Sequence, residues 1–303
     1  MASADLSTSL SKSDRAFGLR LAAPAIIILI ALLAAPTLLT GIYSVFEVPP
    51  NGTTFGRFVG FANYAVIFSS PVFWRSVTVT AIFAVGFVVF STLIGLAMAL
   101  LLNQHFIGRG LARAMLIIPW ATPWLIIGIL WKWFADGSVG GLNAVLVQLH
   151  ILGEYHEFLS DPNLALPLVI LATVWRQGSF AGILLLAGLQ TLPEELSEAA
   201  SLDGANVWDR FVHIILPWLR PVLISVTVLN VIYAFLQFDV VFAMTQGGPG
   251  DATQVLSILI YRQLFGVTHI GVGSALAVVL GVAALIGGLV VVKLLYKAEV
   301  PTA

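Results

Sequence analysis

The chain has 303 residues, a formal net charge of −1 and no cysteine, with 59% hydrophobic and only 10% charged residues. Its mean hydropathy of +1.00 lies far outside the range of soluble domains, so a soluble globular protein is excluded. The missing cysteines exclude disulfides and thiolate metal sites, and the near-zero charge gives no indication of a nucleic-acid partner. We therefore expect an all-α polytopic membrane protein surrounded by lipid.

Six apolar stretches are long enough to cross a bilayer, which takes about 20 apolar residues per helix. They lie at about 19–46, 72–103, 112–134, 164–190, 217–243 and 271–296. The sequence thus predicts one transmembrane domain over 19–297, with tails at 1–18 and 298–303. A cleaved signal peptide over residues 12–35 is the alternative for the first stretch, but the apolar run continues to Phe46.

Lysine and arginine are enriched on one side of these stretches. That side holds Lys12, Arg15, Arg20, Arg109, Arg113, Arg210, Arg220, Lys293 and Lys297. The opposite loops hold only Arg57, Arg75, Lys132 and Arg262. Because cytoplasmic loops are enriched in basic residues, we expect both termini and the loop at 191–217 in the cytoplasm.

The loop at 191–217 has the pattern of a helix, a glycine and a second helix. Thr191 and Glu194 predict a capping box for the first helix, with Pro193 in the first turn, and Gly204 is expected to end that helix in a left-handed conformation. Asn206 is expected to cap the second helix.

The same loop offers a small surface for docking. Leu196, Ala199, Ala200 and Leu202 would form an apolar patch of low profile. Glu198 beside them would supply a charge for an arginine of a partner protein. A solvated connecting loop, or a helix lying on the lipid surface, is the alternative.

This loop resembles the EAA loop in permease subunits of type I ABC importers. The matching residues are Glu198, Ala199, Ala200, Asp203, Gly204, Ile214, Leu216 and Pro217. Segments at 59–61, 187–190, 238–242 and 245–250 are also similar to those of binding-protein-dependent permeases in the MalF/UgpA-like carbohydrate-uptake branch. The likeness covers the chain from about residue 20 onward.

The resemblance implies a multi-pass permease subunit in the bacterial inner membrane, with the six-helix bundle of type I importers. It would import a sugar or sugar-like solute, such as an oligosaccharide, a polyol or a glycerophosphate derivative, by alternating access. The implied partners are a second homologous permease, an extracytoplasmic solute-binding protein and an ABC ATPase dimer docked on residues 192–213. ATP and Mg would be held by that ATPase.

The chain itself has no sequence signature of catalysis. A P-loop requires glycine directly before lysine, and no Gly-Lys pair occurs in the sequence. We therefore expect a subunit that is not an enzyme, with no catalytic residue, metal site or bound cofactor of its own.

Polar and aromatic residues on the fourth and fifth stretches predict a path for the solute. Thr173, Gln177 and Phe180 share one helical face, and Asn230, Tyr233 and Gln237 share another. Amides can bond sugar hydroxyls in both directions, and rings can stack on sugars. These positions also resemble those that line the sugar site of maltose-type permeases. The alternative is hydrogen bonding between helices that stabilises the bundle.

Two charged residues leave further alternatives open. Arg176, near the middle of the fourth stretch, would pair with Asp239, bind an anionic group of the solute or stack on an aromatic ring. Asp239 would carry protons if the chain were instead an ion-coupled secondary transporter. Gly178 and Gly182 are spaced for close packing of the fourth stretch on a neighbouring helix.

Overall fold

The computed structural model describes residues 12–49 and 55–296. Residues 1–11 of the predicted N-terminal tail and the whole predicted tail at 298–303 lie outside the described residues. The described helices are α1 (Lys12–Leu29), α2 (Ala35–Tyr43), α3 (Ala62–Ser69), α4 (Pro71–Asn103), α5 (Arg109–Ala121), α6 (Trp124–Phe134), α7 (Gly141–Gln148), α8 (Ala165–Leu189), α9 (Glu194–Leu202), α10 (Val207–Arg210), α11 (Leu216–Leu236), α12 (Asp239–Met244), α13 (Leu256–Tyr261) and α14 (Ile270–Tyr296). Wide π-helical turns at Ile30–Ala34, Phe211–Ile215 and Arg262–Gly266 continue α1, α10 and α13.

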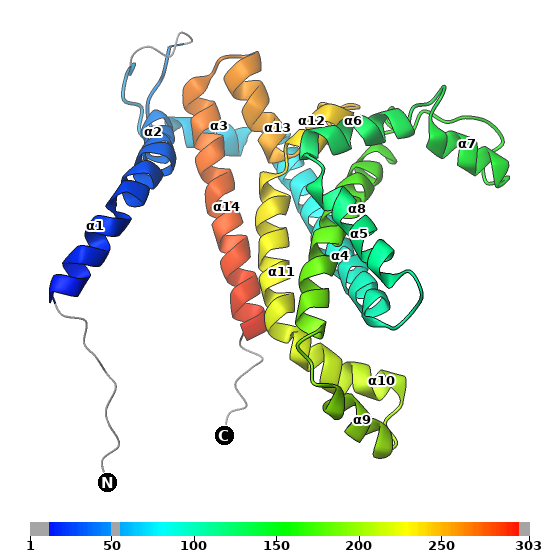
Figure 1. The fold of residues 1–303 in the computed structure, drawn as a ribbon. Coiled ribbons are helices and arrows are strands. Elements are labelled where there is room, and N and C mark those ends of the chain that lie inside the picture. The colour runs from blue at the N-terminus through cyan, green and yellow to red at the C-terminus, as the bar shows by residue number, and fades with distance from the viewer. Residues whose placement is uncertain (1–11, 50–54, 297–303) are drawn as a thin grey trace.

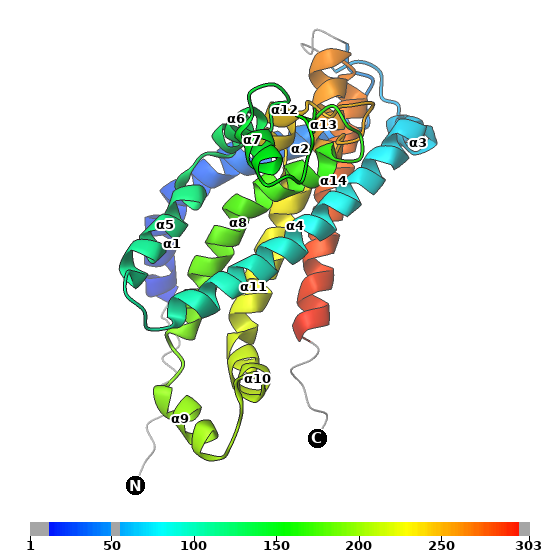
Figure 2. The ribbon, with the colours of Figure 1, turned by 90° about the vertical axis from the view of Figure 1, so that its right-hand side faces the viewer.

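The all-α prediction is confirmed, since within the described ranges only an isolated bridge between Phe46 and Phe58 departs from helices, turns and loops. Five described helices are long and apolar enough to cross a membrane, and the number rises to six if the bent pair α5–α6 is counted as one span. The five are Arg20–Tyr43, Pro71–Asn103, Ala165–Leu189, Val207–Leu236 and Ile270–Leu294. The long helices lie side by side, with α4 crossing obliquely over α8 and α11 (Figures 1 and 2).

The third span is not the single helix predicted over 112–134. It breaks at Thr122 and Pro123, where α5 and α6 are bent by 100°. Proline lacks the N–H that would continue the helix, and it forces the preceding residue out of the helical region. Thr122 is accordingly extended, with φ −77° and ψ 131°.

The fifth span also ends earlier than the predicted residue 243. α11 stops at Leu236, Gln237 is extended, and α12 starts at Asp239. The Ser257 hydroxyl donates to the carbonyl of Gln237 at 2.6 Å, so a main-chain acceptor at the break is satisfied from outside the helix. A contact with a distant segment, rather than a local proline, accompanies this break.

The core lies along α8, the most buried of the long helices, where it packs on α4. Gly95 of α4 makes this approach possible, because a Cβ placed on it would lie 2.5 Å from the Cβ of Ala181. Gly178 and Gly182 of α8 also face α4, and the predicted close packing is confirmed. Here the two helices approach closely because Gly95 lies against Ala181, and Gly178 and Gly182 leave room for Ile94 and Met98 of α4.

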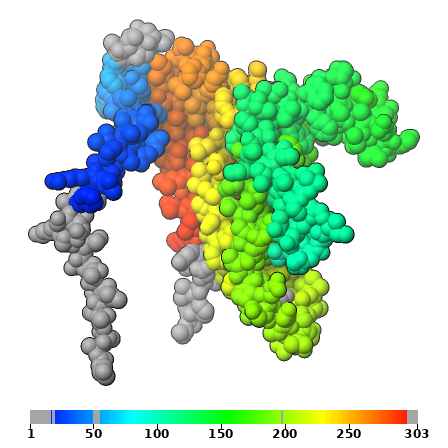
Figure 3. Space-filling model, viewed as in Figure 1, coloured from blue at the N-terminus to red at the C-terminus, as the bar shows by residue number. Residues whose placement is uncertain are grey.

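The first span stands apart from the rest of the bundle. α2 packs on α14, whereas α1 leans away from the other helices (Figures 1 and 3). None of the residues in its most apolar window is buried within the chain. Lipid or another subunit must therefore cover this helix in the membrane.

Candidate functional site

The α9–α10 hairpin, residues 190–215, extends beyond the long helices at the end of the bundle where α8 stops and α11 starts (Figures 1 and 2). Its first helix begins directly after Pro193. The predicted capping box of Thr191 and Glu194 is wrong, because the Thr191 hydroxyl donates instead to the carbonyl of Gly188 at 2.8 Å. Leu192 precedes a proline, which disfavours the helical conformation that a cap at Thr191 would require of it.

The other local predictions for the hairpin are confirmed. Gly204 has a φ of +84° and follows the last residues of α9. Asn206 and Asp209 form a reciprocal capping box at the start of α10, with backbone-to-side-chain distances of 3.0 and 3.2 Å. The direction of the second helix is therefore set by a left-handed glycine followed by a side-chain cap.

The predicted coupling residues lie in two places. Glu198, Ala199, Ala200, Asp203 and Gly204 lie on α9 and at its end, and all are exposed except the half-buried Ala200. Ile214, Leu216 and Pro217 lie at the base of the hairpin, in the wide turn before α11 and in the first turn of α11. The hairpin thus separates an exposed tip from a base that is continuous with a membrane span.

Sequence reasoning missed two exposed apolar residues of the hairpin, Val207 and Trp208, which are 74% and 69% exposed. They lie near Leu202, a residue of the expected apolar patch, which is 90% exposed. The available signal was the pair of large apolar residues directly after the cap Asn206. Together with Leu196 they form what we call the apolar tip: Leu196, Leu202, Val207 and Trp208. Such exposed apolar side chains indicate contact with another surface.

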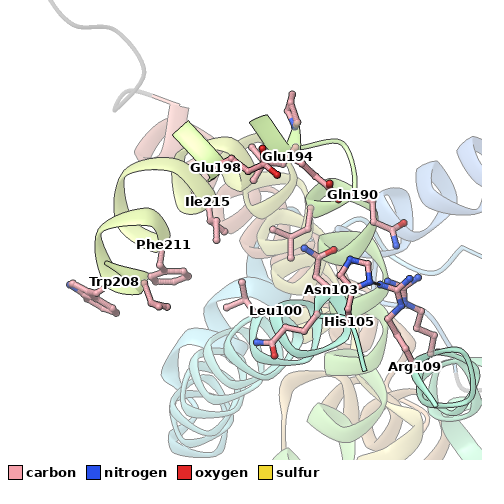
Figure 4. Close-up of a pocket in the computed structure, with 16 residues that line it drawn as sticks. Leu100, Asn103, His105, Arg109, Gln190, Glu194, Glu198, Trp208, Phe211 and Ile215 are labelled. Atoms are coloured by element: carbon pink, nitrogen blue, oxygen red, sulfur yellow. Dashed lines mark hydrogen bonds between the residues drawn. The ribbon is translucent and has the colours of Figure 1, made fainter. Parts of the chain in front are cut away.

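A cavity of about 1070 Å³ lies between the hairpin and the loop that joins α4 to α5. Figure 4 shows Glu194, Glu198 and Phe211 on the hairpin side of this space and Leu100 on the side of α4. Among the described helices, α9 has no extensive packing partner. Within the hairpin, Arg210 donates to the Ser201 hydroxyl at 3.0 Å, and α10 continues through the wide turn into α11. α9 is thus attached to the bundle mainly through the segments at its two ends.

Within the membrane spans, two of the predicted solute-path amides bond to each other. The Gln177 side chain donates to Asn230 at 2.8 Å, and Asn230 donates to the Thr92 hydroxyl at 3.2 Å. Gln177 and Asn230 are fully buried, so in this chain they join α4, α8 and α11. Interhelical hydrogen bonding, one of the two uses expected from the sequence, is what these side chains show.

The other predicted polar positions on these two spans are also buried. Thr173 donates to the carbonyls of Val169 and Ile170 of its own helix. Gln237 is buried at the end of α11, and within the described residues its amide nitrogen has no hydrogen-bond partner. Neither side chain opens onto the surface of this chain.

A second group from the predicted path is accessible and aromatic. Phe180 stacks on Trp120 with ring centroids 6.0 Å apart, and the 40% exposed Tyr233 lies 6.5 Å from Trp124. These rings come from α5, α6, α8 and α11, beside the break in the third span. We call Trp120, Trp124, Phe180 and Tyr233 the aromatic face.

Arg176 belongs to the same face. Its guanidinium carbon lies 3.9 Å from the centroid of the Trp124 ring, and its Nε donates to the carbonyl of Thr122 at 2.9 Å. Of the three expected uses, stacking on an aromatic ring is present. No ion pair with Asp239 occurs in the described part of the chain; Asp239 is exposed at the start of α12.

At the opposite end of the bundle from the hairpin, Asp136 holds the turn after α6. It accepts hydrogen bonds from the Ser138 hydroxyl at 2.7 Å, the Ser138 amide at 2.9 Å and the Val139 amide at 3.0 Å. These donors, the hydroxyl first, lower the pKa of Asp136 below its ordinary value of 3.8. Among residues 12–49 and 55–296, no group of three or more metal-binding side chains gathers in one place.

Comparison with known families gives a match over most of the chain. Residues 91–301 match the family described as the inner membrane component of binding-protein-dependent transport systems. A sulfoquinovosyl glycerol transport permease of Agrobacterium fabrum, SmoG, is 35% identical over 271 residues, covering 89% of this chain and 87% of its own. The trehalose/maltose transport permease MalF of Thermococcus litoralis is 39% identical over 221 residues, covering 73% of this chain and 74% of its own.

The fold has a match among solved structures. A chain of a bacterial ABC transporter involved in import of the acidic polysaccharide alginate superposes with a TM-score of 0.82. The superposition covers 95% of this chain and 98% of that one at 22% sequence identity. The likeness shows that the two chains share a fold.

Proposed function

Because the chain belongs to the family of inner membrane components of binding-protein-dependent transport systems, we propose that it is the permease subunit of an ABC importer for a sugar or sugar-like solute. The observation that carries the proposal is the α9–α10 hairpin, which places Glu198 and the apolar tip beyond the ends of the spans. The carbohydrate class is supported by two relatives whose names give sulfoquinovosyl glycerol and trehalose or maltose as cargo.

The hairpin is the site at which an ATPase would act on this chain. Full burial of a large apolar side chain contributes about 1.5–3 kcal/mol, so covering Leu202 and Trp208 would favour docking of a partner. Nucleotide binding between the two ATPase subunits would then displace the docked hairpins and shift the bundle between inward- and outward-open packings. In this proposal ATP and Mg are bound by the ATPase dimer, and this chain contributes no catalytic group.

The second permease subunit would cover surfaces that this chain leaves open. The aromatic face with Arg176 is accessible beside the break in the third span, and we propose that it contacts the solute at a path shared with that subunit. The buried Gln177 and Asn230 would hold α8 and α11 in the geometry that presents this face. A solute-binding protein would deliver the solute at the end opposite the hairpin.

The family description places the chain in the inner membrane, and the hairpin end would face the cytoplasm. α1 begins and α14 ends on the same side of the bundle as the hairpin (Figure 1). With the basic residues of the adjoining loops, this arrangement supports cytoplasmic termini.

The proposal is tested by purifying the tagged chain from its source organism in a mild detergent and identifying the retained proteins by mass spectrometry, with an untagged strain as control. Recovery of a P-loop ATPase together with a second six-span permease supports it. A stable chain recovered without an ATPase under every condition contradicts it. An ion-coupled transporter, with Asp239 as proton carrier, would then be tested by collapse of uptake with an ionophore; the family match favours the importer.

A further inference from the structure

Arg113 of α5 joins three helices at the root of the hairpin. Its Nε and Nη2 donate to the carbonyl of Leu102, in the last turn of α4, at 3.3 and 2.9 Å. Its Nη1 and Nη2 donate to the side-chain oxygen of Gln190, the residue directly after α8, at 3.1 and 3.0 Å. The Gln190 amide is assigned with its oxygen toward the guanidinium, because the reverse orientation would set donors against donors.

A neighbouring contact adds a fourth helix. The indole N–H of Trp218, in the first turns of α11, donates to the hydroxyl of Thr191 at 3.1 Å. Gln190 and Thr191 are consecutive, and only Leu192 and Pro193 separate them from the start of α9. The root of the hairpin is thus bonded to α4 and α5 through Gln190 and to α11 through Thr191.

We propose that Arg113 is a positioning residue that transmits displacement of the hairpin to α4 and α5. This inference rests on the proposed function, because it concerns how ATP-driven motion of α9 reaches the spans. α9 has no extensive packing partner among the described helices, and the cavity separates the hairpin from the α4–α5 loop. Motion of α9 therefore has to pass through its roots, and the bonds of Arg113 lie at one of them.

Arginine suits this position for two physical reasons. The last carbonyls of a helix lack partners within it, so the end of α4 has acceptors to offer, and a cation near a helix C-terminus is favoured by the helix dipole. The planar guanidinium with five N–H groups can donate hydrogen bonds to the Leu102 carbonyl and the Gln190 side-chain oxygen at the same time. The compact ammonium of lysine would donate with good geometry to only one of these oxygens.

Arg109 provides a matched control one helical turn away. It is also an arginine of α5, but its side chain lies 3.4 Å from His105 in the same loop and bonds to neither α4 nor α8 in the described part of the chain. Replacing it removes the same charge from the same end of the same helix. A difference between variants at 113 and 109 therefore reports the bonds of Arg113 rather than its charge.

The experiment uses the complete importer, with its second permease, ATPase and binding protein, in proteoliposomes supplied with a metabolite extract of the source organism. The solute accumulated and the ATP hydrolysed are measured together for the wild type, Arg113→Ala, Arg113→Lys, Gln190→Ala, the Arg113/Gln190 double variant and Arg109→Ala. Solute moved per ATP should fall about fivefold or more for Arg113→Ala and Gln190→Ala, in line with ordinary coupling free energies. The double variant should fall no further than the worse single variant. Arg113→Lys should be intermediate and Arg109→Ala unchanged.

A second measurement does not depend on the solute. Spin labels at exposed positions, Leu111 of α5 and Glu195 of α9, report the distance between the two helices with and without Mg-ATP and vanadate. In the wild type we expect one narrow distribution in each state. In Arg113→Ala the distribution should broaden, because α9 would move without α5.

The outcomes separate this inference from the proposed function. Parallel loss of uptake and ATP hydrolysis, with their ratio and the distance distributions unchanged, would show that Arg113 only stabilises the fold and overturns the inference. Equal ratios for Arg113→Ala and Arg109→Ala would also overturn it. A wild type that accumulates no solute on ATP addition would contradict the proposed function itself.

Discussion

At the scale of the residue, the hairpin depends on Gly204. Its φ of +84° lies in the left-handed region, where a side chain costs about 1–2 kcal/mol. No heavy atom lies within 4 Å of the position that a Cβ would occupy, so the cost of a substitution there is backbone strain and not a clash. The direction of α10 relative to α9 is therefore sensitive to this one dihedral angle.

Gly204→Val should redirect α10 and uncouple transport from ATP hydrolysis. We expect the amount of folded protein to stay near that of the wild type, because the residue is exposed, while uptake falls about tenfold. Gly204→Asn is the matched control, since asparagine adopts the left-handed region more readily than other residues with a side chain. Equal uptake by Gly204→Val and the wild type would show that coupling does not depend on the direction of α10 relative to α9.

Glu198→Ala should weaken attachment of the ATPase. Glu198 is exposed on α9, and losing a charge-assisted hydrogen bond to a partner arginine costs about 1.5–3 kcal/mol, or roughly ten- to a hundredfold in affinity. The measurement is the ATPase retained by the purified permease as salt is raised. Glu195→Ala removes another exposed charge from the same helix and should retain the ATPase. Identical loss of the ATPase from both variants would show that Glu198 has no specific role.

At the scale of the element, contacts between helices decide both where spans break and how closely they pack. The break at Thr122 follows from a proline, but the carbonyl it exposes accepts from Arg176 of α8, and α6 then packs on α12. Gly128 allows that contact, since a Cβ on it would lie 2.6 Å from the Cβ of Ala243. α6 follows the break after α5, and α12 follows the break after α11. These two helices thus meet at the end of the bundle opposite the hairpin.

Gly95→Leu should destabilise the bundle by forcing α4 away from α8. A Cβ alone at this position would lie 2.5 Å from the Cβ of Ala181 and 2.9 Å from the main-chain nitrogen of Gly182, and overpacking of a core costs about 1–3 kcal/mol or more. Thermal unfolding in detergent should show a lower Tm. Gly281→Leu, on α14 with no atom within 4 Å of its Cβ position, is the control and should unfold like the wild type. A shared Tm for all three proteins would mean that α4 and α8 separate without cost.

At the scale of the whole molecule, the bundle has two unlike ends. One end carries the hairpin, with exposed charges and the apolar tip, and the other carries the short helices α3, α6, α7, α12 and α13 (Figure 1). The long helices connect these ends, and the first span lies on the outside. In the proposed importer, a force applied at the hairpin would act through the long helices on the proposed solute path.

Cysteine labelling tests the orientation of the bundle directly, because the natural chain has no cysteine. Leu202→Cys on the hairpin and Val139→Cys at the opposite end replace residues that are 90% and 69% exposed. With the chain produced without its ATPase, a membrane-impermeant maleimide should label position 139 in intact spheroplasts and position 202 only in inverted vesicles. The reverse pattern would contradict the orientation inferred from the basic residues.

Part of the architecture follows from the sequence alone. The all-α membrane-protein class, the left-handed glycine at 204 and the cap at Asn206 depend on apolar length or on the backbone preferences of a few consecutive residues. Pro123 carries a local signal for a break, although the 100° bend depends also on packing with α8 and α12. The family resemblance found in the hairpin motif is likewise local, and the family match confirms it.

Only the tertiary structure decides which side chains meet. Gln177 and Asn230, 53 positions apart, could each face a solute by periodicity, but their burial against each other is set by the closeness of α8 and α11. The break at Gln237 has no proline and is bonded by a serine 20 positions further along the chain. Arg113 and Arg109 lie four positions apart and nothing local distinguishes them, whereas the bonds of Arg113 to α4 and to Gln190 after α8 exist because three helix ends converge around it. Helical periodicity predicts the face on which a residue lies, whereas the packing of distant segments determines what that face contacts.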